Sequence, residues 1–212
     1  MRAVLWDLDG TLADSREFHW RAWRDTMREA GVEITEAQFL ASFGQRNDAI
    51  LSKWFGGRVP ADRIREIGDA KEALYRRFIQ DEGITPLPGA VEWLRRLHRE
   101  QWRQAIASSA PRLNVEVMAD VLGFKDSLGA LVGAEDVQRG KPDPDVFLAA
   151  ASKLGVPPDR CVVVEDAAAG VEAARRGGMR SIGVGGAELA GADVVIRSLV
   201  ELPADAFGRL IP

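Results

Sequence analysis

A short apolar run lies in the first 15 residues, and beyond residue 82 short apolar runs alternate with longer amphipathic segments. The apolar runs predict buried strands at residues 3–6, 104–107, 130–132, 161–164, 180–184 and 193–196. The segments between the later runs repeat apolar residues at helical spacing and predict helices at residues 90–100, 113–122, 143–154 and 168–177. Strands alternating with helices of about 10–12 residues are typical of a parallel sheet with helices on both faces. The pattern therefore predicts an α/β fold.

Residues 16–81 follow a different pattern, because no strand-like run interrupts them. Helical spacing of apolar residues predicts helices at residues 16–30, 35–43, 47–55 and 60–80. Gly31 and Gly44 end the first two of these helices. We interpret residues 16–81 as an all-helical cap domain inserted after the first strand, with residues 1–15 and 82–212 forming the catalytic core.

Composition places the chain among ordinary soluble globular proteins. It has 212 residues, of which 46% are hydrophobic and 28% charged, and its formal net charge is −4. There is therefore no overall basic field to attract nucleic acid or an anionic membrane. The single cysteine, Cys161, lies in an apolar run, which favours a buried structural thiol and excludes a disulfide within the chain. With neither a signal-peptide pattern nor an apolar stretch of about 20 residues, we expect a cytoplasmic protein.

Two carboxylates, Asp7 and Asp9, follow the first predicted strand. If the strand stops at Asp7, the turn through Gly10 can direct both acids toward the space beyond its carboxyl end, where open α/β sheets bind ligands. Carboxylates this close repel each other unless a cation lies between them, which favours a divalent metal site. The alternative is a strand that simply leads into an Asp-Gly turn.

Polar residues also stand where other predicted strands stop. Ser108 and Ser109 follow the second strand, Glu165 and Asp166 follow the Val-rich strand, and Lys141 lies in a Gly-Lys-Pro-Asp-Pro loop after the third. Carboxyl ends of parallel strands share one edge, so these groups should converge on one pocket. Taken singly, each has a simpler interpretation: a solvated loop lysine, or a serine or acid pair that caps the following helix. Their joint placement favours a catalytic site.

The chemistry follows from these residue types. Carboxylate and carbonyl oxygens suit Mg²⁺, which shares its coordination shell with substrate phosphate. A lysine and a serine hydroxyl would hold a dianionic phosphoryl group. An aspartate can be the nucleophile of phosphoryl transfer, and a second carboxylate can protonate the leaving oxygen and later deprotonate water. The sequence thus predicts a phosphoryl-transfer enzyme.

The same residues resemble the four motifs of the haloacid dehalogenase superfamily of phosphotransferases, and the resemblance covers essentially the whole chain. Asp7-Leu8-Asp9-Gly10-Thr11-Leu12 is similar to the first motif, Ser108 to the second, Lys141 in Gly-Lys-Pro-Asp-Pro to the third and Glu165-Asp166 to the fourth. The helical insertion resembles the C1 cap of the subfamily that includes β-phosphoglucomutase and many sugar-phosphate phosphatases. The resemblance implies a Rossmann-like core with the first strand central.

By resemblance, Asp7 is the nucleophile and Asp9 the general acid and base. Mg²⁺ would bind to Asp7, the Asp9 carbonyl and Asp166, with Glu165 as a further metal group or a partner of a ligand. The resemblance assigns the phosphoryl group to Ser108, Ser109 and Lys141, and Thr11 joins the substrate-binding set. Asp9 separates this chain from the dehalogenases themselves, which lack that acid and need no metal, and no motif residue is lost as in non-enzymatic relatives.

The predicted cap carries most of the candidates for substrate recognition. Ser15, His19 and Trp23 resemble the hinge and first cap helix of β-phosphoglucomutase, although phosphatases of the subfamily carry the same histidine. Three further residues are candidate substrate contacts: Arg46, Lys71 and Arg112.

The choice between phosphatase and mutase depends on the cations that surround the substrate. In the mutase, a lysine precedes the cap glycine and an arginine follows it three residues later, where this chain has Phe43 and Asn47. Ala110-Pro111-Arg112 also replaces the mutase's Ser-Lys-Asn. Since a mutase must hold a bisphosphate at both ends, we favour a Mg²⁺-dependent phosphatase of small sugar or polyol phosphates, with β-phosphoglucomutase as the alternative. A catalytically silent phosphate- or Mg²⁺-binding module is the third possibility.

The motifs specify phosphate and metal but leave the substrate open. We expect a small-molecule phosphate ester as the partner, with no nucleic acid and no membrane, and a monomer, with a dimer as the alternative.

Overall fold

A computed structural model describes residues 1–43 and 45–211, so the predicted break at Gly44 lies outside the described residues. The described chain divides into two compact units. One comprises Met1–Asp14 with Thr85–Pro212, and the other comprises Ser15–Ile84. The second unit is therefore an insertion into the sequence of the first.

The first unit is built on one parallel sheet whose strands appear in the order β3-β2-β1-β4-β5-β6. The strands are β1 (Ala3–Trp6), β2 (Arg103–Ala107), β3 (Ala130–Val132), β4 (Cys161–Glu165), β5 (Arg180–Val184) and β6 (Val194–Ile196). Apart from short differences at their ends, the predicted strands are confirmed, and β1 lies inside the sheet between β2 and β4. The predicted α/β class with a Rossmann-like sheet is correct.

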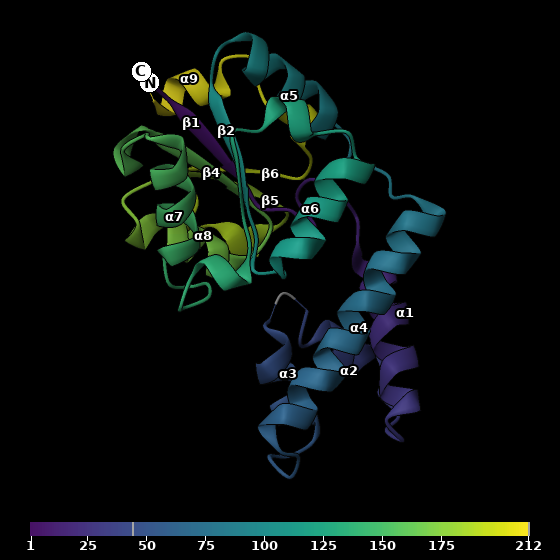
Figure 1. Ribbon diagram of the computed structural model, residues 1–212. Helices are drawn as coiled ribbons and strands as arrows, with labels where there is room; N and C mark the ends of the chain where they lie inside the picture. Colours follow the sequence, from purple (N-terminus) through teal and green to yellow (C-terminus); the bar gives the residue numbers. More distant parts are fainter. Residues whose placement is uncertain (44, 212) are drawn as a thin grey trace. The chain divides into compact units, whose positions relative to one another are not determined.

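Helices cover both faces of this sheet, as Figure 1 shows. They are α5 (Ala90–Arg99), α6 (Arg112–Val121), α7 (Asp145–Leu154), α8 (Ala168–Arg176) and α9 (Ala206–Leu210). Period-two alternation explains how β1 serves both faces. Leu5 joins a buried cluster with Phe147 of α7 and Ala173 of α8. The next residue, Trp6, lies against Phe207 of α9, with ring centroids 6.1 Å apart.

The second unit is entirely helical over its described residues. Its helices are α1 (Arg16–Glu29), α2 (Glu36–Leu40), α3 (Asn47–Trp54) and α4 (Ala61–Glu82). Its core contains Trp23 and Met27 of α1, Leu51 of α3 and Ile67 of α4. Apolar spacing therefore predicted the helices of this unit correctly, although α2 is shorter than expected.

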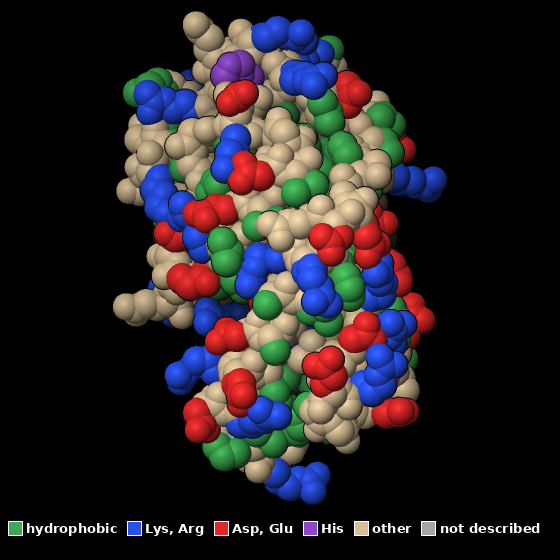
Figure 2. Space-filling view, turned by 45° about the vertical axis from the view of Figure 1, so that its right-hand side comes forward, with side chains coloured by type: hydrophobic (Ala, Val, Ile, Leu, Met, Phe, Trp, Pro, Cys, Tyr) green, Lys and Arg blue, Asp and Glu red, His purple; other side chains and the backbone are tan. Residues whose placement is uncertain are grey.

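Charged side chains of both signs are interspersed on the face of the molecule shown in Figure 2. Local ion pairs on helices include Arg175 with Glu172 at 2.7 Å and Arg96 with Glu100 at 2.8 Å. Exposed pairs of this kind contribute little to stability, because water and salt screen their attraction. Among the described residues, no helix is long and apolar enough to cross a membrane.

Candidate active site

Asp7 occupies the first position beyond the carboxyl end of β1. Its backbone N–H donates to the Val164 carbonyl of β4 at 2.9 Å, so the neighbouring strand fixes where the turn begins. The chain then turns at Gly10, which has a φ of 87° and donates its N–H to the Ala13 carbonyl at 2.9 Å. This left-handed conformation favours glycine. The turn keeps Asp7 buried at the carboxyl edge of the sheet.

Lys141 joins two of the acids. Its ammonium donates to Asp7 Oδ1 at 2.5 Å and to Glu165 Oε2 at 2.7 Å. The lysine side chain is only 8% exposed, so the interpretation as a solvated loop residue is wrong. Because β1 and β4 are hydrogen-bonded neighbours, Asp7 and Glu165 at their carboxyl ends both reach the ammonium of Lys141.

Glu165 belongs to β4 itself, one residue beyond the predicted end of that strand. Its second oxygen, Oε1, accepts from the Ala167 backbone N–H at 3.1 Å. Gly170, in the first turns of α8, lies directly against this carboxylate: a Cβ on Gly170 would be 2.0 Å from Glu165 Oε2. The absence of a side chain at Gly170 therefore gives Glu165 the space it occupies.

Asp7, Glu165 and Asp166 form an acidic group that fits a hard divalent cation. One carboxylate oxygen from each lies within 4.8 Å of the others, and an all-oxygen donor set is the kind that Mg²⁺ prefers. Gly10 also matters here, because a Cβ at this position would lie 2.0 Å from Asp166 Oδ2. The backbone of the first motif thus approaches the acid of the fourth motif closely.

The electrostatics of the group agree with this interpretation. Burial, with the charges of Glu165 and then Asp166, raises the pKa of Asp7 well above its usual value, although Lys141 opposes the shift. Burial and the charges of Glu165 and Asp9 raise the pKa of Asp166 to about 7. Burial would lower the pKa of Lys141, but Asp7 and Glu165 outweigh it and raise that pKa. The negative charge of the three acids thus exceeds the positive charge of Lys141, and a bound metal cation would relieve the repulsion between the carboxylates.

The remaining predicted residues of this unit differ in their burial and in their hydrogen bonds. Asp9 is half-buried after β1, and its carboxylate is outside the three-acid group found among the described residues. Ser108 follows β2 and is buried, and its hydroxyl oxygen accepts from the Ala110 N–H at 3.0 Å. Helix α6 has Pro111 as its N-cap, so Ser108 does not cap it. Ser109 is half-buried, and the Thr11 hydroxyl is buried without a hydrogen-bond partner among the described residues.

Arg112 has acidic partners within its own unit. Its guanidinium contacts Glu116 at 2.9 Å and Asp136 at 3.0 Å, and its backbone N–H donates to Glu135 at 2.7 Å. These contacts hold Arg112 at the start of α6, and a role as a substrate contact would require it to exchange partners.

The residues predicted from the sequence that belong to the helical unit are Ser15, His19, Trp23, Arg46 and Lys71. Arg46 is exposed and pairs with Asp48 at 3.5 Å. Lys71 is buried instead, where its ammonium lies 2.8 Å from His19 Nδ1 and 2.8 Å from Glu72 Oε1. Sequence reasoning missed Glu72, because nothing in the sequence distinguishes a buried glutamate from the exposed acids of a charged helix. The one available sign was its position next to Lys71, which was itself a candidate.

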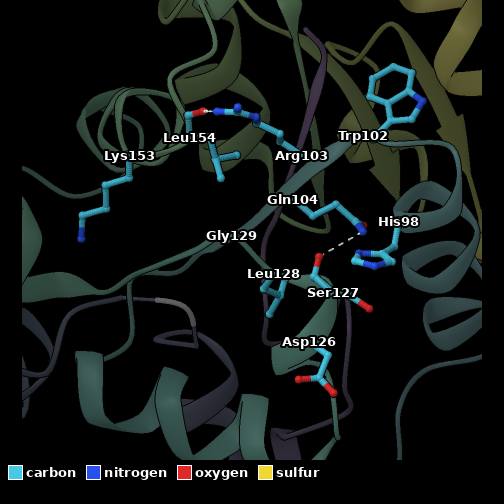
Figure 3. A pocket seen from close by; sticks show the side chains of 10 residues that line it. All are labelled: His98, Trp102, Arg103, Gln104, Asp126, Ser127, Leu128, Gly129, Lys153 and Leu154. Carbon is cyan, nitrogen blue, oxygen red and sulfur yellow. Dashed lines mark hydrogen bonds between the residues drawn. The ribbon is translucent and has the colours of Figure 1, made fainter.

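A pocket of about 310 Å³ lies at the opposite edge of the sheet, near the amino ends of β2 and β3 (Figure 3). The side chain of Gln104, which lines it, already bonds within the protein, because its amide donates to the Leu94 and Ser127 carbonyls and its oxygen accepts from Trp6. Arg103 likewise donates to the Leu154 carbonyl. This pocket contains none of the predicted catalytic residues.

Comparisons with known proteins agree on one family. A family model of haloacid dehalogenase-like hydrolases matches residues 1–178. The chain is 33% identical over 213 residues to β-phosphoglucomutase of Bacillus subtilis (strain 168), covering 95% of this chain and 92% of that protein. It is also 33% identical over 210 residues to hexitol phosphatase B of Escherichia coli (strain K12), covering 95% of this chain and 94% of that protein.

One similar protein is much longer. The chain is 36% identical over 189 residues to SUPPRESSOR OF QUENCHING 1 of Arabidopsis thaliana, a match to 86% of this chain that spans only 18% of the plant protein. Among solved structures, a β-phosphoglucomutase of Clostridium difficile is similar with a TM-score of 0.88 and 26% identity, covering 99% of this chain and 96% of that one.

Proposed function

Because the chain belongs to the haloacid dehalogenase-like hydrolases and is a phosphoric monoester hydrolase, we propose that it is a Mg²⁺-dependent phosphatase of sugar or polyol phosphates. The observation that carries this proposal is the group in which Lys141 joins Asp7 and Glu165, with Asp166 beside them. The proposed nucleophile, the Lys141 ammonium and the proposed oxygen ligands of a metal come from one edge of one sheet, which supports the proposal.

In the proposed reaction, a carboxylate oxygen of Asp7 attacks the phosphorus of the ester, and the bond from phosphorus to the ester oxygen breaks. Asp9 gives its proton to the departing oxygen, which leaves as an alcohol. Asp9 then takes a proton from water, and the resulting hydroxide attacks the aspartyl-phosphate. The bond between phosphorus and the Asp7 oxygen breaks, which releases inorganic phosphate and restores the Asp7 carboxylate.

The other residues act on charge and position. Lys141 would donate hydrogen bonds to the phosphoryl oxygens as negative charge builds up on them, and Ser108 would donate its hydroxyl proton. Asp7, Asp166 and the Asp9 carbonyl would hold Mg²⁺, with Glu165 either as a further ligand or as the residue that orients Lys141. A bound Mg²⁺ would neutralise charge on the transferring group.

The helical unit supports a phosphatase over a mutase. Asn47, which stands where the mutase carries an arginine, donates its amide to Glu72 at 2.7 Å. The Asn47 side chain is therefore engaged by the Glu72 carboxylate. As an uncharged amide, it also provides no positive charge to bind a second phosphate group. We also propose that this unit, expected at residues 16–81, acts as a cap that selects the substrate. Similarity to β-phosphoglucomutases keeps mutase activity as the second candidate function.

A panel of hexitol, hexose and pentose phosphates, with released phosphate as the readout, tests the proposal. We expect Mg²⁺-dependent release that stops with EDTA and falls to background in Asp7→Asn, which keeps the shape of the side chain but removes the nucleophile. Turnover that survives either treatment would rule out the aspartyl-phosphate mechanism. With β-glucose 1-phosphate and a trace of the 1,6-bisphosphate, glucose 6-phosphate forming faster than free phosphate would make the protein a mutase.

A further inference from the structure

The loop that follows β2 carries Ser108 and is hydrogen-bonded to the loop that follows β3. At its start, the Ser108 N–H donates to the Val132 carbonyl at 3.1 Å, which continues the pairing of β2 with β3. Midway along it, the Ala110 carbonyl accepts from the Ala134 N–H at 2.9 Å. We call residues 108–112, from the end of β2 to the first residue of α6, the serine loop.

Asp136 connects the end of the serine loop to the loop after β3. Its Oδ2 accepts from the Arg112 guanidinium at 3.0 Å and from the Gly133 N–H at 2.8 Å. Its Oδ1 accepts from Nζ of Lys153, on α7, at 2.5 Å. The preceding residue, Glu135, accepts from the Arg112 N–H at 2.7 Å. The first residue of α6 is therefore held through its backbone and its side chain together.

Asp136 keeps its charge in this arrangement. Burial would raise the pKa of its carboxyl, but the hydrogen bonds from Lys153, Gly133 and Arg112 outweigh burial and lower that pKa to about 2. Burial would likewise lower the pKa of Arg112, but its hydrogen bonds to Asp136 and Glu116 raise it. The carboxylate and the guanidinium thus remain oppositely charged throughout the physiological pH range.

Gly133 shows how closely the two loops approach each other. A Cβ at this position would lie 2.6 Å from the backbone N of Arg112 and 3.1 Å from the Ala110 carbonyl oxygen. The backbone of Gly133 is extended, with a φ of −120° that any residue adopts, so glycine is needed here for space rather than for conformation. Packing this tight transmits a shift of one loop to the other.

The same contacts determine where the Ser108 hydroxyl lies. Its oxygen accepts from the Ala110 N–H at 3.0 Å. This bond uses a lone pair of the oxygen and leaves the hydroxyl hydrogen for another acceptor, such as a phosphoryl oxygen. The direction in which Ser108 donates therefore depends on the position of Ala110. That position is fixed in turn by Ala134 and, two residues further along the chain, by the contacts of Arg112.

We propose that Asp136 is a positioning residue: by anchoring Arg112 to the loop after β3, it directs the Ser108 hydroxyl toward the phosphoryl group of the substrate. The anchor follows from the contacts of Asp136 alone. Its effect on turnover rests on the proposed function, in which Ser108 donates a hydrogen bond to the phosphoryl group.

Amide hydrogen exchange tests the anchor itself. Asp136→Asn keeps the shape of the side chain and one acceptor oxygen, but it removes the charge that holds Arg112 and Lys153. The amides of Ala110 and Ala134 should then exchange roughly tenfold faster than in the wild type, because opening of the loop requires less free energy. Unchanged exchange of both amides in folded Asp136→Asn would overturn the proposal.

Asp193→Asn is the matched control. The Asp193 carboxylate also accepts from an arginine and from a backbone N–H, in this case Arg180 and Ser181, both at 2.8 Å. Asp193 directly precedes β6, so it lies at the amino ends of the strands, whereas Ser108 follows the carboxyl end of β2. The control should therefore weaken a comparable ion pair and leave both the serine loop and turnover unchanged.

Kinetics test the positioning role with a phosphate ester that the wild type hydrolyses. Ser108→Ala removes a hydrogen bond to a charged group, so kcat/KM should fall roughly 10- to 100-fold. Asp136→Asn should lower kcat/KM roughly tenfold, mainly through kcat, because a misdirected donor matters most as charge builds up in the transition state. In the Ser108→Ala background, Asp136→Asn should change kcat/KM by less than about twofold, since the hydroxyl through which it acts is gone.

A merely structural role of Asp136 predicts a different result. Asp136→Asn would then lower kcat/KM by the same factor with and without the Ser108 hydroxyl, and this outcome would refute the proposal. If Asp136→Asn does not fold, Gly133→Ala provides the second test. It leaves every charge in place and displaces the serine loop through its new Cβ, so its effect on kcat/KM should also disappear in Ser108→Ala. Wild-type kcat/KM in Gly133→Ala would contradict the proposed coupling between the two loops.

These measurements separate the inference from the proposed function. If the wild type hydrolyses no ester, the proposed function fails and the positioning role fails with it, whereas hydrogen exchange still decides whether Asp136 anchors the serine loop. If the wild type hydrolyses an ester and Asp136→Asn loosens the loop while kcat/KM stays at the value of Asp193→Asn, the proposed function stands and the positioning role is wrong.

Discussion

Replacing Gly170 by alanine should destabilise the protein, although helix propensity alone would predict a more stable helix. Gly170 lies inside α8, where replacing glycine by alanine normally stabilises a helix by about 1 kcal/mol. At this position, however, the new Cβ would lie 2.0 Å from Glu165 Oε2 and 2.1 Å from its Cδ. Real carbon–oxygen contacts are far longer, so the Glu165 carboxylate would have to move.

The cost of that movement can be worked out from the contacts of Glu165. Moving the carboxylate breaks its bonds to Lys141 at 2.7 Å and to the Ala167 N–H at 3.1 Å. Overpacking a tight site costs about 1–3 kcal/mol, and separating a buried ion pair costs about 3–5 kcal/mol. These costs overlap, and the helix gains about 1 kcal/mol. Gly170→Ala should therefore lose about 2–4 kcal/mol, a fall in Tm of roughly 5–15 °C for a protein of this size.

Thermal unfolding measures the effect, with Gly208→Ala as the control. Gly208 lies in helix α9, and a Cβ there would meet nothing within 4 Å, so this variant should keep or slightly raise the Tm. Phosphate release should also fall in Gly170→Ala, because Lys141 loses the partner that orients it. A Gly170→Ala protein that melts at or above the wild-type temperature would refute the assigned position of Glu165.

Two further predictions concern stability in each unit. The pKa of Glu72 is lowered to about 2 in the folded protein, so its contribution of up to about 3 kcal/mol is complete above pH 4.5 and is lost as the pH falls through 2. Urea titrations from pH 6 to pH 2.5 should show this loss, and Glu72→Gln should show a smaller one. Phe207→Ala should cost about 3–5 kcal/mol, because Phe207 is buried against Trp6, Trp93 and Trp102. Val200→Ala, at a side chain 65% exposed, should leave the urea midpoint unchanged, and an equal loss in both variants would contradict the aromatic packing.

The fold was largely predictable because burial leaves a local trace. Runs such as Cys161–Val164 are apolar at every position, which is typical of strands covered on both faces. The end of β4 was the part that this trace missed. Glu165 belongs to the strand because its backbone continues the ladder with β5, where it pairs with Gly183, and an acidic residue hides that continuation.

The candidate site contains residues that could be placed from the sequence and others that could not. Residues at strand ends, such as Asp7 and Glu165, could be placed together because parallel strands end at a common edge. Contacts between helices could not be placed, because they depend on packing rather than on local sequence. Lys71 has the sequence context of a surface residue in a charged helix, yet its burial follows from the rings of Trp23 and Tyr75. Its partner His19 lies on α1, and their contact follows from the packing of α1 against α4.

The interior position of β1 has a consequence for the order in which the protein is made. During synthesis, Asp7 emerges long before its partners: Lys141 follows it by 134 residues, and β4, which pairs with β1, begins at Cys161. The helical unit is continuous in sequence and can fold before the first strand has gained its neighbours. Contacts between distant parts of a chain form slowly. Catalytic competence is therefore acquired late in translation, and a ribosome that stalls before Cys161 leaves an apolar strand without one of its two neighbours.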